Sequence, residues 1–399
     1  MPETKKKILM ISFRCPWPQE KGGYNLRFLN IAKILNKSFQ VDLLTLIEDR
    51  QEEKYTGELK KIFENVIYFY HPKVNEYFNS FKSIFSLKPL QSGYFYSPRM
   101  ANWLNKNYKN YDLIFCSTIR TVEYVKKIDV KKCLDFVDAI SLNYHEAKEN
   151  TKGLWKLIYS IENKRLLRYE RKATEYFDLA FITTKKDKNF IFKNENAKVV
   201  ILQNGVKGEL LQRNFKEQEE NWLTFLGKMD YQPNEDACLF FANKVFPKIK
   251  SKHSEIEFYI VGINPTKKIL NLQKTKGVIV TGKVKDPYSY LERSKLVVAP
   301  LRFGGGMQNK ILEGMALSKT VLTTPIGAAG ITEAKDGKHL IIADHKDPEE
   351  MAEKINWLLN TEDVRKKIGE NARTLILENY TWERVEKILL KFINNYNNE

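Results

Sequence analysis

The sequence is poor in cysteine and histidine, and the few residues of these types follow no pattern. The four cysteines, Cys15, Cys116, Cys133 and Cys238, lie far apart in a 399-residue chain that has only five histidines. No Cys-x-x-Cys pair or mixed Cys/His spacing typical of a metal site occurs. The sequence therefore argues against a zinc-binding module and a disulfide framework, and predicts reduced, structural thiols in a cytosolic protein.

Long hydrophobic runs are also missing. The basic start of the chain is followed by an apolar run of only Ile8–Phe13, which is too short for a signal-peptide core. No stretch reaches the roughly 18 apolar residues that a membrane span needs. No Asp-x-Asp metal motif or internal repeat stands out. These absences predict a cytoplasmic enzyme or binding protein without a metal or cofactor.

Basic residues outnumber acidic ones, with 66 Lys and Arg against 49 Asp and Glu and a net charge of +17. Residues 1–200 hold 36 basic and 23 acidic residues, whereas residues 201–399 hold 30 and 26. A basic first half suits a phosphate-rich partner, such as an anionic lipid, a phosphorylated acceptor or a nucleic acid. It is equally compatible with a surface that is basic only for solubility. No nucleic-acid-binding module is recognisable, and we expect no such partner.

Two successive sets of short apolar runs indicate two α/β domains. The chain is too long for one ordinary core. The runs are rich in Ile, Val, Leu and Phe without alternation, as expected for parallel strands that helices cover on both faces. The first set of predicted strands is Ile8–Phe13, Val41–Leu46, Asp112–Cys116, Lys132–Val137, Leu179–Thr183 and Val199–Leu202, with helices at Leu26–Leu35 and Arg165–Phe177. The second set is Leu223–Leu226, Glu257–Val261, Val278–Thr281, Leu296–Ala299, Thr320–Thr323 and Leu340–Ile342, with helices at Asp236–Ile249, Pro287–Arg293, Gln308–Ala316, Pro348–Asn360 and Asp363–Asn379.

The alternation of strands and helices predicts two doubly wound, Rossmann-like domains, residues 1–203 and 204–378. The boundary is expected near Asn204-Gly205, and the polar stretch Lys207–Asn221 is expected to be a linker or excursion. A last helix, Trp382–Phe392 with Thr381 as N-cap, lies in residues 379–399, which we expect to pack back toward the first domain.

Two segments of the first half combine basic with apolar residues. Glu76–Leu104 mixes aromatic residues with Lys82, Lys88 and Arg99, which suits a membrane interface, a sugar-binding surface or a helical pair packed on the first domain. The helix segment Lys164–Arg171, with sequence KRLLRYER, could contact an anionic membrane or an acidic acceptor, or it could be a solvated face.

A glycine-rich loop between a strand and a helix is the strongest chemical signal. In Val297–Gly330 a strand ends at Pro300, and Gly304-Gly305-Gly306 leads into a helix expected from about Met307. Glycines let the backbone approach a ligand, and the free N–H groups of a helix start attract phosphate. Lys310 would add positive charge, and Glu313 could bind sugar hydroxyls. A tight turn would explain three glycines as well. The loop and helix start comprise Gly304, Gly305, Gly306, Met307 and Gln308.

This stretch resembles the donor-site signature of glycosyltransferase family 4, whose members have the GT-B fold. The matching residues are Pro300, Gly304–Gly306, Glu313–Ala316, Lys319 and Pro325–Gly327. The similarity covers nearly the whole chain and is closest to bacterial sugar transferases of exopolysaccharide and PEP-CTERM export systems. Further matches to that group are Pro16–Pro18 with Gly22-Gly23, Asp135–Asp138, Gly227–Asn234 and Trp382.

The resemblance implies two domains that face each other across a cleft, with the acceptor on residues 1–203 and a nucleotide-sugar donor on residues 204–378. It also implies a retaining transfer to a glycan or lipid-linked acceptor, without a metal or cofactor. Two family residues are absent: the first motif glutamate is replaced by Gly305, and a family Lys by Asn234. Lys228 matches the family's diphosphate-binding Arg, and Lys310 is the candidate for the missing charge. Electrostatic stabilisation of the departing diphosphate is the expected catalysis.

Other residues follow from their places after strands. Asp138 lies at the carboxyl end of a strand, where it could hold a donor hydroxyl, accept the acceptor proton or cap a helix. The resemblance implies a His in this loop, and His145 is either that contact or a surface residue. Gly22-Gly23 would approach the donor phosphate or the acceptor, or form a simple turn. The resemblance places Gly262 and Lys283-Val284 by the nucleobase.

Two other functions are compatible with the pattern. The missing motif glutamate and lysine favour a catalytically silent GT-B protein that binds sugar nucleotides. A nucleotide-sugar 2-epimerase has the same fold but needs more acid/base residues than this sequence presents. A peripheral contact with the inner face of an anionic membrane is the remaining expected partner.

Overall fold

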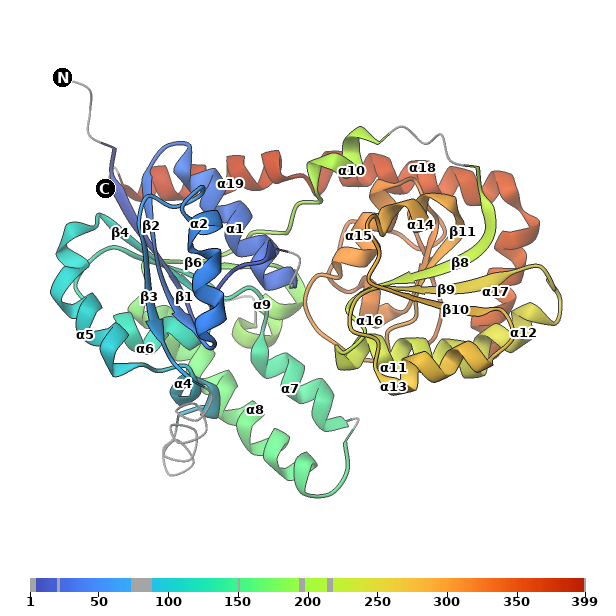
Figure 1. Ribbon diagram of the computed structural model, residues 1–399, viewed down its shortest axis with the longest axis horizontal. Helices are drawn as coiled ribbons and strands as arrows, with labels where there is room; N and C mark the ends of the chain where they lie inside the picture. The colour runs from blue at the N-terminus through green and yellow to red at the C-terminus, as the bar shows by residue number, and fades with distance from the viewer. Residues whose placement is uncertain are drawn as a thin grey trace. The chain divides into compact units, whose positions relative to one another are not determined.

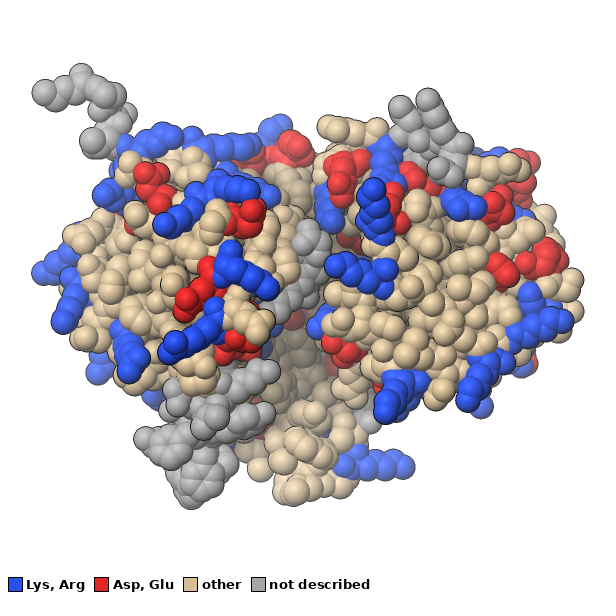
Figure 2. Space-filling view, in the orientation of Figure 1, with Lys and Arg blue, Asp and Glu red and all other residues tan. Residues whose placement is uncertain are grey.

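The computed structural model describes residues 5–19, 22–72, 88–149, 151–193, 198–213 and 218–397. The chain divides into two compact units, Met1–Leu202 with Glu386–Glu399 and Gln203–Val385. Each unit is built around one parallel β-sheet (Figure 1). Lysines and arginines are spread over the face of each unit shown in Figure 2, where acidic residues are interspersed with them.

The first unit contains a seven-stranded sheet in the order β3-β2-β1-β4-β5-β6-β7. The predicted aromatic segment contains α4 (Leu90–Tyr94) and most of α5 (Pro98–Asn107), while its residues 76–87 lie outside the described residues. Met100 and Leu104 of α5 are fully buried, so this part packs on the core. The strands are β1 Lys7–Ser12, β2 Gln40–Ile47, β3 Val66–Tyr70, β4 Leu113–Ser117, β5 Lys132–Asp135, β6 Leu179–Ile182 and β7 Val199–Ile201. The helices are α1 Gly23–Asn36, α2 Thr56–Leu59, α4 Leu90–Tyr94, α5 Pro98–Asn107, α6 Val122–Val125, α7 Ile140–Glu149, α8 Leu154–Ala173 and α9 Lys185–Phe192.

The second unit contains a six-stranded sheet in the order β10-β9-β8-β11-β12-β13. Leu223 and Phe225 join one hydrophobic cluster and Leu226 joins another, because successive side chains of a strand point to opposite faces. The strands are β8 Glu220–Leu226, β9 Glu257–Val261, β10 Val278–Gly282, β11 Ser294–Ala299, β12 Val321–Thr323 and β13 Ile341–Ile342. The helices are α10 Gly208–Gln212, α11 Gln232–Phe240, α12 Phe246–Lys250, α13 Lys267–Asn271, α14 Tyr288–Arg293, α15 Asn309–Ala316, α16 Pro325–Ala328, α17 Pro348–Asn360 and α18 Glu362–Asn379, followed by α19 Trp382–Asn397, in which the division between the units falls.

All the predicted strands are present within a few residues, and the structure adds one that the pattern missed. β3 is an edge strand with half-exposed and exposed side chains, so it lacks the continuous apolar run of a central strand. The N-cap prediction for the last helix is confirmed, because the Arg384 amide donates to Thr381 Oγ1 at 3.3 Å.

The structure differs from four local predictions in detail. The expected helix Asp236–Ile249 is interrupted by a π-helical turn at Phe241–Val245 before Pro247, whose nitrogen cannot donate a hydrogen bond. α8 begins at Leu154 rather than at Arg165. The apolar residues of its first turns face outward, so this part lacks the core-facing apolar stripe that predicts a helix. The expected linker Lys207–Asn221 contains α10, which the fully buried Leu210 anchors. The helix expected from about Met307 is present as α15, which begins at Asn309 with Gln308 as its N-cap.

Candidate functional site

The carboxyl edge of the second sheet has a topological switch point between β8 and β11. The chain leaves β8 toward β9 and leaves β11 toward β12, so the two connections diverge. Open parallel sheets bind ligands at such a point. Lys228 follows β8 by two residues, and the glycine loop Gly304–Gly306 follows β11. The structure therefore brings two parts of the predicted donor site to adjacent strand ends.

The glycine loop needs glycine for its backbone conformation. Gly304 has φ of 117° and Gly306 has φ of 73°, both in the region that residues with a side chain rarely adopt. A Cβ atom at Gly304 would also approach two carbon atoms of Pro233 at 3.3 Å. The loop is thus a conformationally demanding turn whether or not it holds a ligand.

The start of α15 is left without a side-chain cap. Gln308 is the N-cap residue, but its side chain accepts no hydrogen bond from a backbone amide of the first turn. Instead, Gln308 Nε2 donates to the Gly305 carbonyl oxygen at 3.1 Å, and its Oε1 accepts from Lys310 Nζ at 3.0 Å. Met307 is partly buried against the hydrophobic cluster beneath. The first amides of α15 are therefore open to an anion.

Lys310 is a partly buried cation in this first turn. Its Nζ atom lies 5.7 Å from the centre of the Phe225 ring. Burial lowers the pKa of Lys310 to about 8, although Glu313 and Cys238 oppose the shift. A lysine with such a pKa is still mostly protonated at neutral pH. It would gain charge on contact with an anion.

Glu313 lies one turn further along α15. Its Oε1 atom accepts a hydrogen bond from the Tyr288 hydroxyl at 3.2 Å. Burial raises the pKa of Glu313 to about 7, opposed by Lys207, Tyr288 and Lys310. A carboxyl group that is partly protonated at neutral pH can both donate to and accept from sugar hydroxyls.

Lys228 is the more exposed of the two predicted cations, with 41% of its side chain accessible. Its Nζ atom lies 3.3 Å from an Asp230 carboxylate oxygen. The Asn234 side chain donates to the Lys228 carbonyl oxygen at 2.9 Å, so the residue at the position of the family Lys fixes the backbone of this loop.

Gly262 and Val284 follow strands that lie farther from the switch point. A Cβ atom at Gly262 would lie 1.7 Å from the Gly227 carbonyl oxygen, so backbone packing alone requires glycine there. Val284 is partly buried against the core, and Lys283 is exposed. Their contact with a nucleobase stays a prediction.

The first sheet has its own switch point, between β1 and β4. Gly22 is the N-cap of α1 and Gly23 its first residue, and no side chain caps this helix. A Cβ atom at Gly22 would meet nothing within 4 Å. The sequence analysis missed Arg14 and Arg120, which follow β1 and β4 at this edge.

Asp138 follows β5, the strand next to β4. Its Oδ2 atom accepts from Asn143 Nδ2 at 2.9 Å. Burial raises the pKa of Asp138, opposed by Asn143 and Arg120. The preceding residue, Val137, has φ of 67°, which is strained for a β-branched side chain. Strain of this kind occurs at sites where a side chain must be placed precisely against a ligand.

A buried ion pair holds this strained turn. Arg27 Nε and Nη2 donate to the two carboxylate oxygens of Asp135 at 2.7 and 2.9 Å, and both side chains are almost fully buried. The Val137 amide donates to Asp135 Oδ1 at 3.2 Å. α1 and the turn before Asp138 are therefore tied together.

Two further acids near Asp138 escaped the sequence analysis. Burial raises the pKa of Glu170 to about 8 and that of Asp187 to about 6. Glu170 accepts a hydrogen bond from the Ser141 amide at 3.1 Å, and Asp187 accepts one from the Ala139 amide at 3.1 Å. Both carboxyl groups therefore bind backbone amides at the start of α7. His145 lies farther along α7, where its ring packs 5.6 Å from that of Phe190.

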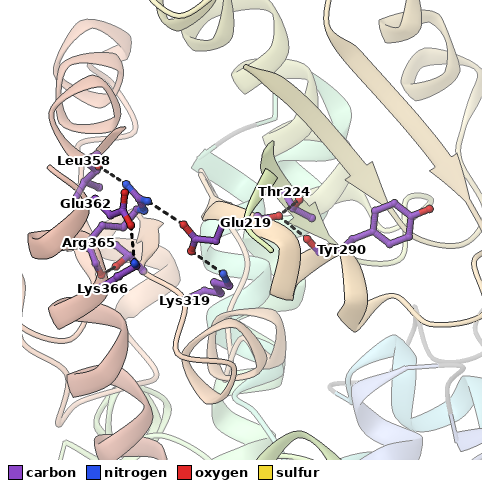
Figure 3. Close-up of polar contacts among 10 residues, drawn as sticks. Glu219, Thr224, Tyr290, Lys319, Leu358, Glu362, Arg365 and Lys366 are labelled. Atoms are coloured by element: carbon purple, nitrogen blue, oxygen red, sulfur yellow. Dashed lines mark hydrogen bonds and ion pairs between the residues drawn. The ribbon is translucent and has the colours of Figure 1, made fainter. Parts of the chain in front are cut away.

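The opposite, amino edge of the second sheet carries a separate ionic cluster (Figure 3). Glu219 bridges Lys319 Nζ at 2.8 Å and Arg365 Nη2 at 2.9 Å. Burial by itself would raise the pKa of Glu219, but these two cations hold it below its usual value. A depression of about 690 Å³ adjoins this cluster. Lys319, although part of the family signature, therefore stabilises the fold away from the carboxyl edge.

Within the described ranges, no three His, Cys, Asp or Glu side chains gather in a way that could hold a metal ion. Among the described helices, none combines the length and the apolar character needed to cross a membrane.

Comparisons with known proteins agree with this architecture. A protein of Klebsiella pneumoniae, named only as an uncharacterized 44.6 kDa protein in the cps region, is 24% identical over 96% of this chain and 99% of its own. Anabaena HepE, solved in complex with UDP and glucose, superposes with a TM-score of 0.70 at 14% identity, over 98% of this chain and all of its own. S. aureus TarM, solved with ligands that include UDP, gives 0.71 at 15% identity, over 98% and 99%. Residues 220–361 match the model of the family described as glycosyl transferases group 1. The chain thus has the GT-B fold, and its second unit is similar to the family of glycosyl transferases group 1.

Proposed function

We propose that the protein is a retaining, metal-independent glycosyltransferase of family 4. It transfers a sugar from a nucleotide-sugar donor to a glycan or lipid-linked acceptor in surface-polysaccharide or glycoconjugate synthesis. The observation that carries this proposal is the arrangement of Lys228, the glycine loop and Lys310 at the switch point of the second sheet. The cps region of the Klebsiella relative and the UDP complexes of the structural neighbours support it.

The proposed chemistry is electrostatic. Breaking the bond between the anomeric carbon and the phosphate leaves negative charge on the departing diphosphate. Lys228, Lys310 and the open amides of α15 would stabilise that charge, and removal of one such donor from a preorganised site typically costs 10²–10³-fold in kcat, as an order of magnitude. Glu313 would bind a donor hydroxyl. Asp138 would hold a hydroxyl or take the acceptor proton.

The test is thermal unfolding with UDP-, GDP-, ADP-, CMP- and TDP-linked sugars, with and without EDTA. A ligand at 100 times its Kd stabilises the folded state by about 2.7 kcal/mol. We expect sugars of one nucleotide class to raise the unfolding temperature, and we expect EDTA to leave that rise unchanged. The shift should be weakened in Lys310→Met and kept in Lys244→Met, which removes an exposed lysine of the same unit. NMR of the sugar released by slow donor hydrolysis would report retention.

Three results would contradict the proposal. No shift with any nucleotide sugar would remove the donor-site assignment. Binding without transfer or hydrolysis would favour the catalytically silent alternative. If the first-formed sugar has the inverted configuration, the protein is still a glycosyltransferase but not a retaining one.

We also propose peripheral contact with an anionic membrane at the cytoplasmic face, through the outward face of α8. Leu154, Leu157 and Ile161 are 72%, 57% and 45% exposed, and the same helical stripe continues with basic residues. In Figure 1 α7 and α8 run side by side and extend beyond the rest of the first unit, and Figure 2 shows the end of this hairpin as mostly uncharged. An apolar end with a basic continuation suits insertion beneath anionic headgroups. The basic residues are Lys164, Arg168 and Arg171.

Vesicle sedimentation tests this contact. The protein should bind vesicles that contain phosphatidylglycerol more strongly than pure phosphatidylcholine vesicles. The double variant Leu157→Ser, Ile161→Ser should lose most of that binding. Leu377→Ser, which changes an exposed leucine of α18, should retain it. Equal binding by all three proteins would contradict the assignment to α8.

A further inference from the structure

Two arginines meet at the switch point of the first sheet. Arg14 lies two residues after β1, and Arg120 lies three residues after the neighbouring strand β4. Their guanidinium carbons lie 5.2 and 4.6 Å from the centre of the same Phe13 ring. The parallel sheet therefore holds two positive charges close together at the edge where such sheets bind ligands.

Among the described residues, neither arginine forms an ion pair. In the part of the protein that the structure describes, no carboxylate oxygen lies within 4 Å of a guanidinium nitrogen of either residue. Arg120 Nε donates to the neutral Gln91 side chain at 2.9 Å. Arg14 Nε is buried and has no hydrogen-bond partner. Burial lowers the pKa of Arg120, and the charge of Arg14 lowers it further, whereas the charge of Asp138 opposes the shift. Holding two like charges together in this way is unfavourable unless an anion compensates them.

Aromatic rings fix the two guanidinium groups in place. Arg14 also lies 5.2 Å from the Tyr24 ring, and Arg120 lies 5.5 Å from the Phe95 ring. The Phe13 ring packs on both of these rings, with centroid distances of 4.8 and 4.7 Å. A guanidinium group that is stacked on a ring keeps its donors in one plane, as bidentate binding of an oxyanion requires.

The uncapped start of α1 adjoins the same place. Tyr24 is the second residue of α1, and its hydroxyl lies 2.8 Å from Ser12 Oγ at the end of β1. Gly22 and Gly23 put no side chain over the first amides of this 14-residue helix. The partial positive charge of the helix start therefore adds to that of the two arginines.

We propose that Arg14, Arg120 and the first turn of α1 form a subsite for an oxyanion of the acceptor, a phosphate or a carboxylate. This inference rests on the proposed function. It assigns the anion to the acceptor because the second unit already supplies two lysines and a glycine loop for the donor diphosphate. Asp138 follows the strand beside β4, and its charge acts on Arg120. An acceptor that is held by its anionic group at the arginines would therefore present a hydroxyl near this carboxylate.

Isothermal titration of the full chain tests the subsite with glycerol 3-phosphate, glucuronate, neutral glucose and UDP. We expect at least one of the two anionic compounds to bind, and the one that binds identifies the acid group. Arg14→Gln and Arg120→Gln should each raise its Kd about 10- to 100-fold, the effect of losing a charge-assisted hydrogen bond. Arg99→Gln, which removes an exposed arginine of α5, should leave the Kd unchanged. The Kd for UDP should stay within about twofold in all three variants, since the donor site uses other residues.

The unfolding temperature separates a binding role from a structural one. Removal of one of two repelling cations should leave this temperature unchanged or raise it, whereas a structural arginine would lower it. The proposal is overturned if the arginine variants bind UDP more weakly and glycerol 3-phosphate and glucuronate as before, or if neither of these binds the wild type. Failure of the wild type to bind any nucleotide sugar would instead count against the proposed function.

Discussion

The two parallel sheets reach the same kind of switch point with different chemistry. At the second sheet, a glycine loop, open amides and two lysines surround the point between β8 and β11. At the first sheet, two arginines stacked on aromatic rings and a strained turn before Asp138 surround the point between β1 and β4. Backbone amides and ammonium groups suit a diphosphate whose charge grows during reaction, whereas guanidinium groups held against aromatic rings suit a permanent anion. The same topology thus carries two kinds of cation, and under the proposed function lysines would serve the donor and arginines the acceptor.

The largest expected effect is the loss of stability when the buried ion pair of the first unit is broken, compared with a more exposed ion pair of the second unit. Arg27→Met would leave Asp135 buried without its partner and should destabilise the first unit by about 3–5 kcal/mol. Arg302→Met breaks the more exposed pair with Asp236 in the second unit and should cost about 1 kcal/mol or less. Urea unfolding of both variants measures the difference. Equal losses would show that the Arg27 pair is no more important than an exposed one.

The second expected effect separates the two switch points in catalysis. Lys310→Met should lower kcat by about 10²–10³-fold, because the leaving diphosphate loses one preorganised charge. Steady-state kinetics with the nucleotide sugar found in the panel measure it. The same variant should bind glycerol 3-phosphate or glucuronate as the wild type does. A loss of both bindings would mean that the two switch points act as a single site.

A third, somewhat smaller effect is expected at Asp138. If it takes the acceptor proton, Asp138→Asn should lower kcat by about 100-fold without changing the Kd for UDP. Because burial raises the pKa of Asp138, kcat/KM should fall on acidification at a higher pH than an ordinary aspartate would give. A pH–rate profile measures this limb. If the acidic limb of the profile is unchanged in Asp138→Asn, it belongs to another group, such as Asp187.

The smallest expected effect is a proton taken up on donor binding. Lys310, with a pKa of about 8, is mostly neutral at pH 8.5. A bound diphosphate would raise that pKa toward its ordinary value, so UDP binding should take up about 0.7 proton. Titration calorimetry in buffers of different ionisation enthalpy measures the uptake. It should vanish in Lys310→Met and persist in Glu313→Gln.

The shifted pKa values also make the free energy of unfolding of the ligand-free protein depend on pH. The folded pKa of Lys310 lies below its unfolded value, so the folded state binds fewer protons between about pH 8 and 10.5 and gains stability as pH rises there. The raised pKa of Glu313 has the opposite consequence. Its contribution is present at low pH and is lost as pH rises from about 4.5 to 7. Both contributions should disappear in the corresponding neutral variants.

The sequence by itself determined the two sets of strands and the glycine loop with Lys310, because buried strands and tight loops impose local residue patterns. It did not reveal β3, whose side chains are half exposed, or the convergence of Arg14 with Arg120, which lie over 100 residues apart in the chain. Only the parallel sheet aligns the ends of distant strands and so creates such a pair. Tertiary burial likewise decided the pKa values of Lys310, Glu313 and Glu170, because desolvation depends on neighbours that a linear pattern does not specify.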